Sequence, residues 1–153
     1  LTIVGDGPER NTLSNLAETL RIQGKVEFTG TLTGRKLYEK YQECDVFVMP
    51  SKKIGQDIEG FGMVFLEAGF FKKPSIGTWS GGIPEAVQHK QTGILVPEGD
   101  IIALKNALEL LLTDENLARK LGENAYKRVT RNFTWENAAK SLLNFFNEVV
   151  DEG

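Results

Sequence analysis

The sequence contains a single cysteine and a single histidine in 153 residues. One cysteine, Cys44, cannot form a disulfide within the chain, which excludes a disulfide-stapled secreted domain and leads us to expect a cytoplasmic protein. The sequence has no Asp-x-Asp pair and no cluster with metal-ligand spacing, so no metal is expected. Its apolar runs fall far short of the about 20 residues that cross a membrane.

A basic excess is also missing, because 18 Lys and Arg face 21 Asp and Glu and give a net charge of −3. No nucleic-acid partner is therefore expected. Hydrophobic residues make up 41% of the chain, which is ordinary for a globular protein, and the length fits one domain over residues 1–153. The chain opens directly on the apolar strand Leu1–Val4, and we expect this domain to be truncated at its N-terminus.

Apolar runs without alternation are separated by stretches of helical periodicity, the pattern of a parallel sheet with helices on both faces. The fold class predicted is therefore α/β, a Rossmann-like parallel sheet. The strands are expected at 1–4, 25–29, 45–49, 74–77 and 93–96, and the helices at 8–22, 34–43, 61–72, from 83, and at 101–112, 115–130 and 135–150. Ligands bind such sheets beyond the carboxyl ends of the strands. Four turns fall there and are expected along one edge: 5–8, 29–32, 50–62 and 77–82.

The segment Glu59-Gly-Phe-Gly-Met-Val-Phe-Leu-Glu67 carries two carboxylates around the start of the helix expected at 61–72. Eight helical steps rise on the order of 12 Å and leave the two side chains roughly 80° apart, so both acids can face one cleft. Free amides at the helix N-terminus between them attract an anion. Such a segment suits a ligand with hydroxyl groups on both sides of an anion. A sugar joined through a diphosphate to a ribose has this arrangement.

A second glycine turn, Ser80-Gly-Gly-Ile-Pro-Glu85, follows the strand expected at 74–77. We expect the main-chain amides of Gly81 and Gly82 to shape the sugar or diphosphate pocket. Trp79, just before this turn, is expected either to stack on a ligand or to pack against Phe61. His89 is expected at the surface, without an acid or base role.

Seven motifs in order resemble the donor-binding C-terminal half of retaining GT-B glycosyltransferases, in the family 4-like group that contains bacterial mannosyl- and glucosyltransferases of lipid, lipopolysaccharide and capsule synthesis. The resemblance covers essentially the whole chain. The motifs are Ile3-Val-Gly-Asp-Gly-Pro8, Val26-Glu-Phe-Thr-Gly30, Asp45-Val-Phe-Val-Met-Pro-Ser51, the segment from Glu59 to Glu67, Gly81-Gly-Ile-Pro-Glu85, Thr92-Gly-Ile-Leu-Val-Pro97 with Gly99-Asp100, and Phe133-Thr-Trp135.

The resemblance implies a role for each matching residue. Glu59 would be the catalytic residue, lying beside the transferred sugar and orienting its hydroxyls, and Glu67 would hold the ribose hydroxyls. The other donor-binding residues implied are Gly60, Phe61, Gly62, Met63 and Val64 around the sugar and diphosphate, Thr29, Gly30, Thr31 and Leu32 near the base, and Leu37 packed on it. The donor would be a GDP- or UDP-sugar, and no cofactor is implied.

The resemblance also implies parts that this chain lacks. An acceptor-binding N-terminal half would complete the cleft, an upstream Arg and Lys pair would stabilise the leaving diphosphate, and the helix at 135–150 would pack toward that half. We therefore expect the isolated chain to be inactive. The sugar would be transferred to an acceptor hydroxyl with retention of its anomeric configuration. We expect that the acceptor could be linked to a membrane lipid, in which case the full-length protein would be peripheral at the inner face of the membrane. The long loop 52–58 resembles that of lipid mannosyltransferases using GDP-mannose.

Two other interpretations stay open from the sequence. One is a noncatalytic domain that binds a nucleotide sugar on the same scaffold, which the presence of both Glu59 and Glu67 disfavours. The other is a nucleotide-sugar epimerase of GT-B architecture, which relies on other acids and histidines, whereas this chain offers only His89.

Overall fold

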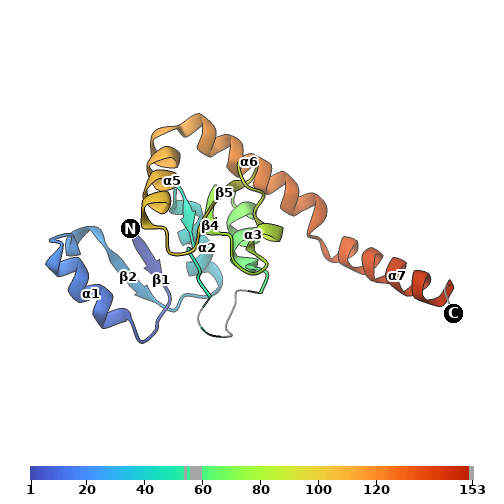
Figure 1. The fold of residues 1–153 in the computed structure, drawn as a ribbon, viewed down its shortest axis with the longest axis horizontal. Helices are drawn as coiled ribbons and strands as arrows, with labels where there is room; N and C mark the ends of the chain where they lie inside the picture. The colour runs from blue at the N-terminus through green and yellow to red at the C-terminus, as the bar shows by residue number, and fades with distance from the viewer. Residues whose placement is uncertain (54, 56–59, 152–153) are drawn as a thin grey trace. The chain divides into compact units, whose positions relative to one another are not determined.

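The computed structural model describes residues 1–53, 55 and 60–151, with side chains described through residue 146 (Figure 1). The chain divides into two compact units, Leu1–Gln42 and Glu43–Gly153, called here the first and the second unit.

The first unit is built on a two-stranded parallel sheet. Strand β1 (Thr2–Val4) pairs with β2 (Glu27–Gly30), with Thr2 opposite Glu27 and Ile3 opposite Phe28. Three helical elements accompany the strands: α1 (Arg10–Thr19), the 3-10 turn Gln23–Lys25, and α2 (Gly34–Glu43). The buried side chains here are Ala17 of α1 and Tyr41 of α2.

The second unit is built on a three-stranded parallel sheet in the order β3-β4-β5. These strands are Phe47–Val48, Ser75–Thr78 and Gly93–Val96. The central strand β4 is buried along its whole length and pairs on both sides, Ser75 lying opposite Phe47 and Gly93. A strand buried on both faces reads as an unbroken apolar or small-residue run, as this one does.

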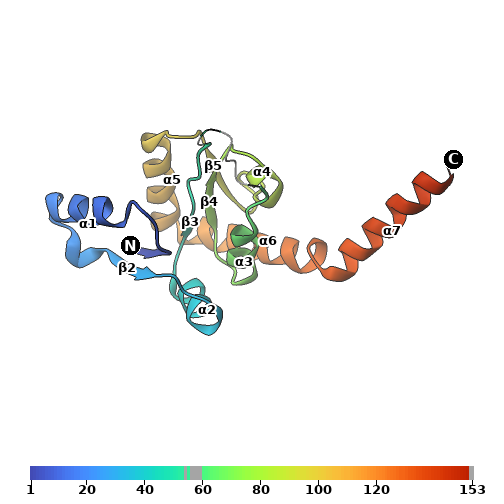
Figure 2. The same cartoon turned by 90° about the horizontal axis from the view of Figure 1, so that it is seen from below.

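Helices cover both faces of this sheet. Figures 1 and 2 show α3 (Met63–Phe70) and α4 (Ile83–Ala86) on one side of β4 and β5, and α5 (Ile101–Thr113) on the other. Helix α6 (Glu115–Asn132) packs on α3, and α7 (Trp135–Asp151) follows it. The side chains of Asp100 and Asp114 cap α5 and α6 by accepting the Ala103 and Leu117 N–H, each at 2.9 Å.

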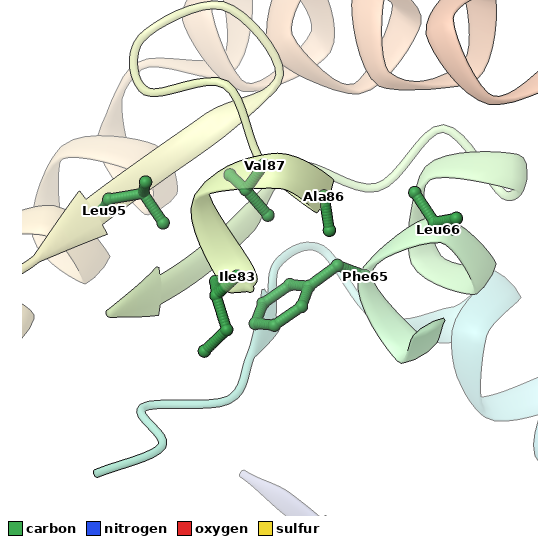
Figure 3. Close-up of a cluster of buried hydrophobic side chains, with 6 residues drawn as sticks. All are labelled: Phe65, Leu66, Ile83, Ala86, Val87 and Leu95. Carbon is green, nitrogen blue, oxygen red and sulfur yellow. The ribbon is translucent and has the colours of Figure 1, made fainter. Parts of the chain in front are cut away.

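Each face of the sheet carries its own hydrophobic core. On the α3 and α4 side the buried side chains are Phe65, Leu66, Ile83, Ala86, Val87 and Leu95, and Figure 3 shows the Phe65 ring pointing toward Ile83. On the other face they are Ile76, Val96, Ala107, Leu111 and Leu121. Neighbouring residues Leu95 and Val96 of β5 point to opposite cores, as the alternation of a strand requires.

The predicted α/β class with parallel strands is confirmed. The helix expected at 34–43 and the strand at 93–96 have the predicted bounds, whereas the strand expected at 45–49 shortens to Phe47–Val48. The ladder hydrogen bonds form two sheets, so the four ligand-edge turns divide between the two units, and their placement along one edge stays a prediction. No helix among the described residues is long and apolar enough to cross a membrane.

Candidate functional site

The start of α3 combines a left-handed glycine with open backbone amides. Gly62 is buried and has φ +77°, and its carbonyl accepts the Phe65 N–H at 2.9 Å. A Cβ at Gly62 would lie 2.7 Å from Cδ2 of Phe65. Only glycine adopts this conformation without strain. The helix therefore begins at Met63 rather than at the predicted 61, and the Met63 and Val64 amides lie in the first turn, where a helix supplies no carbonyl partner.

The turn after β4 lies directly against the chain that enters α3. A Cβ placed on Gly82 would be 2.0 Å from the Gly60 carbonyl oxygen and 3.1 Å from Cα of Phe61. Gly81 beside it is exposed and has φ +50°. The structure thus brings together two segments that the sequence analysis singled out separately, because the second carries no side chain at the point of contact.

Hydrogen bonds connect the carboxyl ends of the three strands of the second unit. The Thr78 hydroxyl, at the end of β4, donates to the Ser51 carbonyl at 2.5 Å, and the Lys53 N–H donates to Oε2 of Glu98 at 2.9 Å. The bond from Lys53 holds the pKa of Glu98 below its usual range. The sequence analysis did not single out Thr78 or Glu98. The only sequence signal for them is that each lies just after a predicted strand, 74–77 for Thr78 and 93–96 for Glu98.

The buried hydroxyl of Ser80 lies at the same edge. It is close enough to the Glu98 carboxylate to lower the pKa of Glu98 as well, yet no described residue meets the geometry of a hydrogen bond to it. Buried polar groups are normally paired, so an unpaired one is a reason to look for a ligand or water there.

The two predicted acids have different outcomes. Glu67 is half-buried on α3, one helical turn beyond Met63. Glu59 lies outside the described residues, as do 54 and 56–58 of the preceding loop, so the geometry between the two carboxylates stays a prediction. Lys52 and Lys53 of the described part of that loop are exposed.

The base-binding turn predicted at 29–32 belongs to the first unit. The Gly30 carbonyl accepts the Gly5 N–H at 2.9 Å and the Thr29 hydroxyl at 2.8 Å, which fixes the turn to the end of β1. Thr31 is exposed and Leu32 is half-buried, as is Leu37 on α2. Arg10, which the sequence analysis did not single out, lies over the Phe28 ring at 5.8 Å and donates to the Phe28 carbonyl at 3.4 Å.

The aromatic contacts near the site differ from those expected. Trp79 packs against His89, with ring centroids 5.5 Å apart, whereas Phe61 packs against Phe133 at 5.6 Å. The ring contact of Trp79 is thus with His89 rather than with Phe61, and the alternative that Trp79 stacks on a ligand stays a prediction. His89 is half-buried rather than a simple surface residue, because its Nδ1 accepts the Leu95 N–H at 3.0 Å.

We expect the second unit to lose stability as the pH falls from 7 toward 5. Burial lowers the pKa of His89 below the usual 6.5, and the positive charge of Lys90 lowers it further by a smaller amount. The folded state thus resists protonation of His89. The contribution of the neutral His89 to stability is complete above the unfolded pKa of about 6.5 and is lost as the pH falls toward the lowered folded pKa. Protonation of Nδ1 would also remove the acceptor for Leu95.

The measurement is urea unfolding across this pH range, with His89→Gln as the comparison. The variant should be less stable at pH 7 and less dependent on pH. A wild-type stability that stays constant between pH 7 and 5 would contradict the assignment.

Among the described residues no group of three or more His, Cys, Asp or Glu side chains is arranged to hold a metal ion. What the edge offers instead is amides at a helix start, a buried hydroxyl and carboxylates, a set that suits an anion joined to hydroxyl-bearing groups.

The family described as glycosyl transferases group 1 matches residues 1–128 of this chain. The chain belongs to this family. The group 1 glycosyl transferase chain is 37% identical over 147 residues to a GDP-mannose-dependent alpha-(1-6)-phosphatidylinositol monomannoside mannosyltransferase of Mycobacterium tuberculosis. It is 36% identical over 150 residues to N-acetyl-alpha-D-glucosaminyl L-malate synthase of Bacillus anthracis.

These alignments cover 95% and 98% of the group 1 chain but 38% of each relative. The chain thus spans less than half the length of the curated relatives that it matches. In three dimensions it superposes on sucrose-phosphate synthase of Thermosynechococcus elongatus with a TM-score of 0.82 and 31% identity, over 100% of this chain and 39% of that one. The predicted resemblance to GT-B glycosyltransferases is confirmed.

Proposed function

We propose that this chain is the donor-binding C-terminal half of a retaining glycosyltransferase, which binds a nucleoside-diphosphate sugar and transfers the sugar to a hydroxyl acceptor. The observation that carries the proposal is the close approach of Gly82 to the Gly60 carbonyl. Two glycine-lined turns then meet at the first turn of α3, where open amides and the positive end of the helix favour a diphosphate.

The proposed roles follow the polarity of the donor. The amides at Phe61, Gly62, Met63 and Val64, with those of Gly81 and Gly82, hold the sugar and diphosphate, and Glu67 accepts the ribose hydroxyls. Thr29, Gly30, Thr31, Leu32 and Leu37 form the base site. Glu59 orients the transferred sugar. The departing diphosphate takes the proton of the acceptor hydroxyl on the same face of the sugar, so the anomeric configuration is kept. No cofactor takes part.

The proposed donor is GDP-mannose. One observation supports a guanine nucleotide and mannose: the M. tuberculosis relative is by its name GDP-mannose-dependent. The resemblance of the loop 52–58 to that of lipid mannosyltransferases using GDP-mannose points the same way. That relative also acts by its name on a phosphatidylinositol mannoside, which supports a lipid-linked acceptor and a peripheral position at the inner, cytoplasmic face of the membrane.

Calorimetric titration of the chain with GDP, UDP and ADP tests the proposed function. GDP should bind more tightly than the other two nucleotides. In NMR spectra of the chain, GDP should also shift the backbone amide signals of Met63 and Val64. Tighter binding of UDP would change the proposed donor. Failure of all three nucleotides to bind would overturn the assignment as a donor-binding half.

The acceptor half is proposed to lie in the part of the relatives that this chain does not cover. Helix α7 supports this, because its apolar side chains are exposed: Trp135, at 93%, and then Leu142, Leu143, Phe145 and Phe146. A stripe of this kind usually packs against another element. We propose that 135–150 packs toward the N-terminal half.

We expect the isolated chain to bind GDP-mannose without transferring mannose, because the acceptor side of the cleft is absent. Release of GDP in the presence of a phosphatidylinositol mannoside acceptor measures transfer, and a full-length relative serves as the positive control. Turnover by the isolated chain would show that the second half is not needed for catalysis.

A further inference from the structure

A polar cavity of about 410 Å³, open to solvent, lies in the second unit, between α6 and the turn that leads from α4 into β5. Gln88, Gln91 and Thr92 line it from the turn. Asn124, Lys127, Arg128, Arg131 and Asn132 line it from α6. Spacings of three and four residues place these α6 side chains on one face of the helix. None of the donor-site residues proposed above belongs to this lining.

The charge of the cavity has one sign. Its lining holds three cationic side chains, those of Lys127, Arg128 and Arg131, and no carboxylate. Lys127 and Arg131 form no ion pair or side-chain hydrogen bond with any described residue. Like charges gathered in this way repel one another unless an anion lies between them.

The walls are fixed by hydrogen bonds that leave donors for a ligand. The Asn124 amide donates to the Gln91 carbonyl at 3.0 Å, and the Thr92 hydroxyl accepts the Gln88 N–H at 2.9 Å, so this hydroxyl can still donate. The bond from Asn124 joins α6 to the turn, and the bond from Gln88 to Thr92 fixes the turn itself.

Arg128 is held more firmly still. Its two Nη groups donate to the carbonyls of Ala86 at 3.2 Å and Glu85 at 2.7 Å, and its guanidinium lies 4.7 Å from the Phe133 ring centroid. Burial lowers the pKa of Arg128, and its buried Nε has no partner among the described residues. Arg128 is therefore fixed in position by the fold, and its charge lies in the wall of the cavity.

We propose that this cavity binds a small phosphorylated polyol. Lys127 and Arg131 carry the charge that recognises a phosphate, and Arg128 adds to it. The amides of Gln88, Gln91 and Asn132 can donate to and accept from hydroxyl groups. The volume suits a ligand of that size. A soluble phosphate ester and the headgroup of a phospholipid share this chemistry, and the experiment separates the two sources.

The probes are glycerol 3-phosphate and vesicles of phosphatidylcholine with and without phosphatidylglycerol. Glycerol 3-phosphate should shift the amide signals of residues 88–92 and 124–132 of this chain. Lys127→Gln with Arg131→Gln should weaken its binding at least about tenfold. Lys105→Gln with Arg119→Gln removes the same charge from outside the cavity and should leave binding unchanged. Arg128 is left intact because it holds α4.

Each outcome decides the proposal. Vesicle binding with the same dependence on Lys127 and Arg131 supports the site and makes a lipid headgroup its occupant. Three results would overturn it: equal losses of glycerol 3-phosphate affinity in both double variants, vesicle binding without any binding of soluble glycerol 3-phosphate, or amide shifts confined to the start of α3. The last result would concern the donor site alone, so failure here leaves the nucleotide titration unaffected.

Discussion

Gly82→Ala is expected to lower the free energy of unfolding of the second unit by about 1–3 kcal/mol, the usual cost of overpacking. The added Cβ would lie 2.0 Å from the Gly60 carbonyl oxygen and 3.0 Å from its carbon. Both atoms belong to the backbone, so no flexible side chain can move aside to make room. Urea unfolding followed by circular dichroism measures the difference.

Gly60→Ala is the matched control, because it changes the other glycine of the same contact. A Cβ on Gly60 meets nothing within 4 Å, and its backbone does not require a positive φ. Its unfolding free energy should stay within about 0.5 kcal/mol of the wild type, or rise slightly through the lower entropy of the unfolded chain. Equal losses in the two variants would show that the turn does not lie against the start of α3.

Glu67→Ala is expected to weaken binding of the bare nucleoside diphosphate by about 1–3 kcal/mol, roughly five- to 150-fold. The proposed reason is the loss of charge-assisted hydrogen bonds from the ribose hydroxyls to the carboxylate on α3. Calorimetry with GDP measures the change. Glu109→Ala, which removes an exposed carboxylate from α5, should leave the affinity unchanged.

Glu59→Ala should spare the bare nucleotide and weaken only the nucleotide sugar, because its proposed contacts are with the transferred sugar. The comparison is therefore between GDP and GDP-mannose for each variant. If both variants lose the same affinity for both ligands, the division of work between the two acids is wrong.

Local sequence signals predicted the helices and strands whose ends are clearly marked in the sequence. The helix predicted at 34–43 matches α2, and the strand predicted from the apolar run at 93–96 matches β5. The glycine-rich segments at 60–62 and 81–82 were predicted to serve one site, and the structure brings them into contact. In each case the deciding signal lies within a few consecutive residues.

Contacts between distant residues could not be predicted in the same way. The bond from Lys53 to Glu98 joins positions 45 apart, and Arg128 reaches Glu85 across 43. Nothing in the residue types marks either pair, because Glu98 and Arg128 look like ordinary charged surface residues in the sequence. The cavity beside α6 is invisible for the same reason, since its lining comes from a turn and a helix separated by β5 and α5.

The sandwiched position of β4 has a consequence for how the second unit opens. Ile76 fills the core on one face, and Gly77, next in the same strand, faces Phe65 and Ile83 of the other, with a Cβ there meeting each at 2.9 Å. Neither core can melt while its neighbour stays intact, because the strand between them would lose its pairing on both sides. Hydrogen exchange at the β4 amides should therefore require global unfolding and report the cooperative stability of the whole unit.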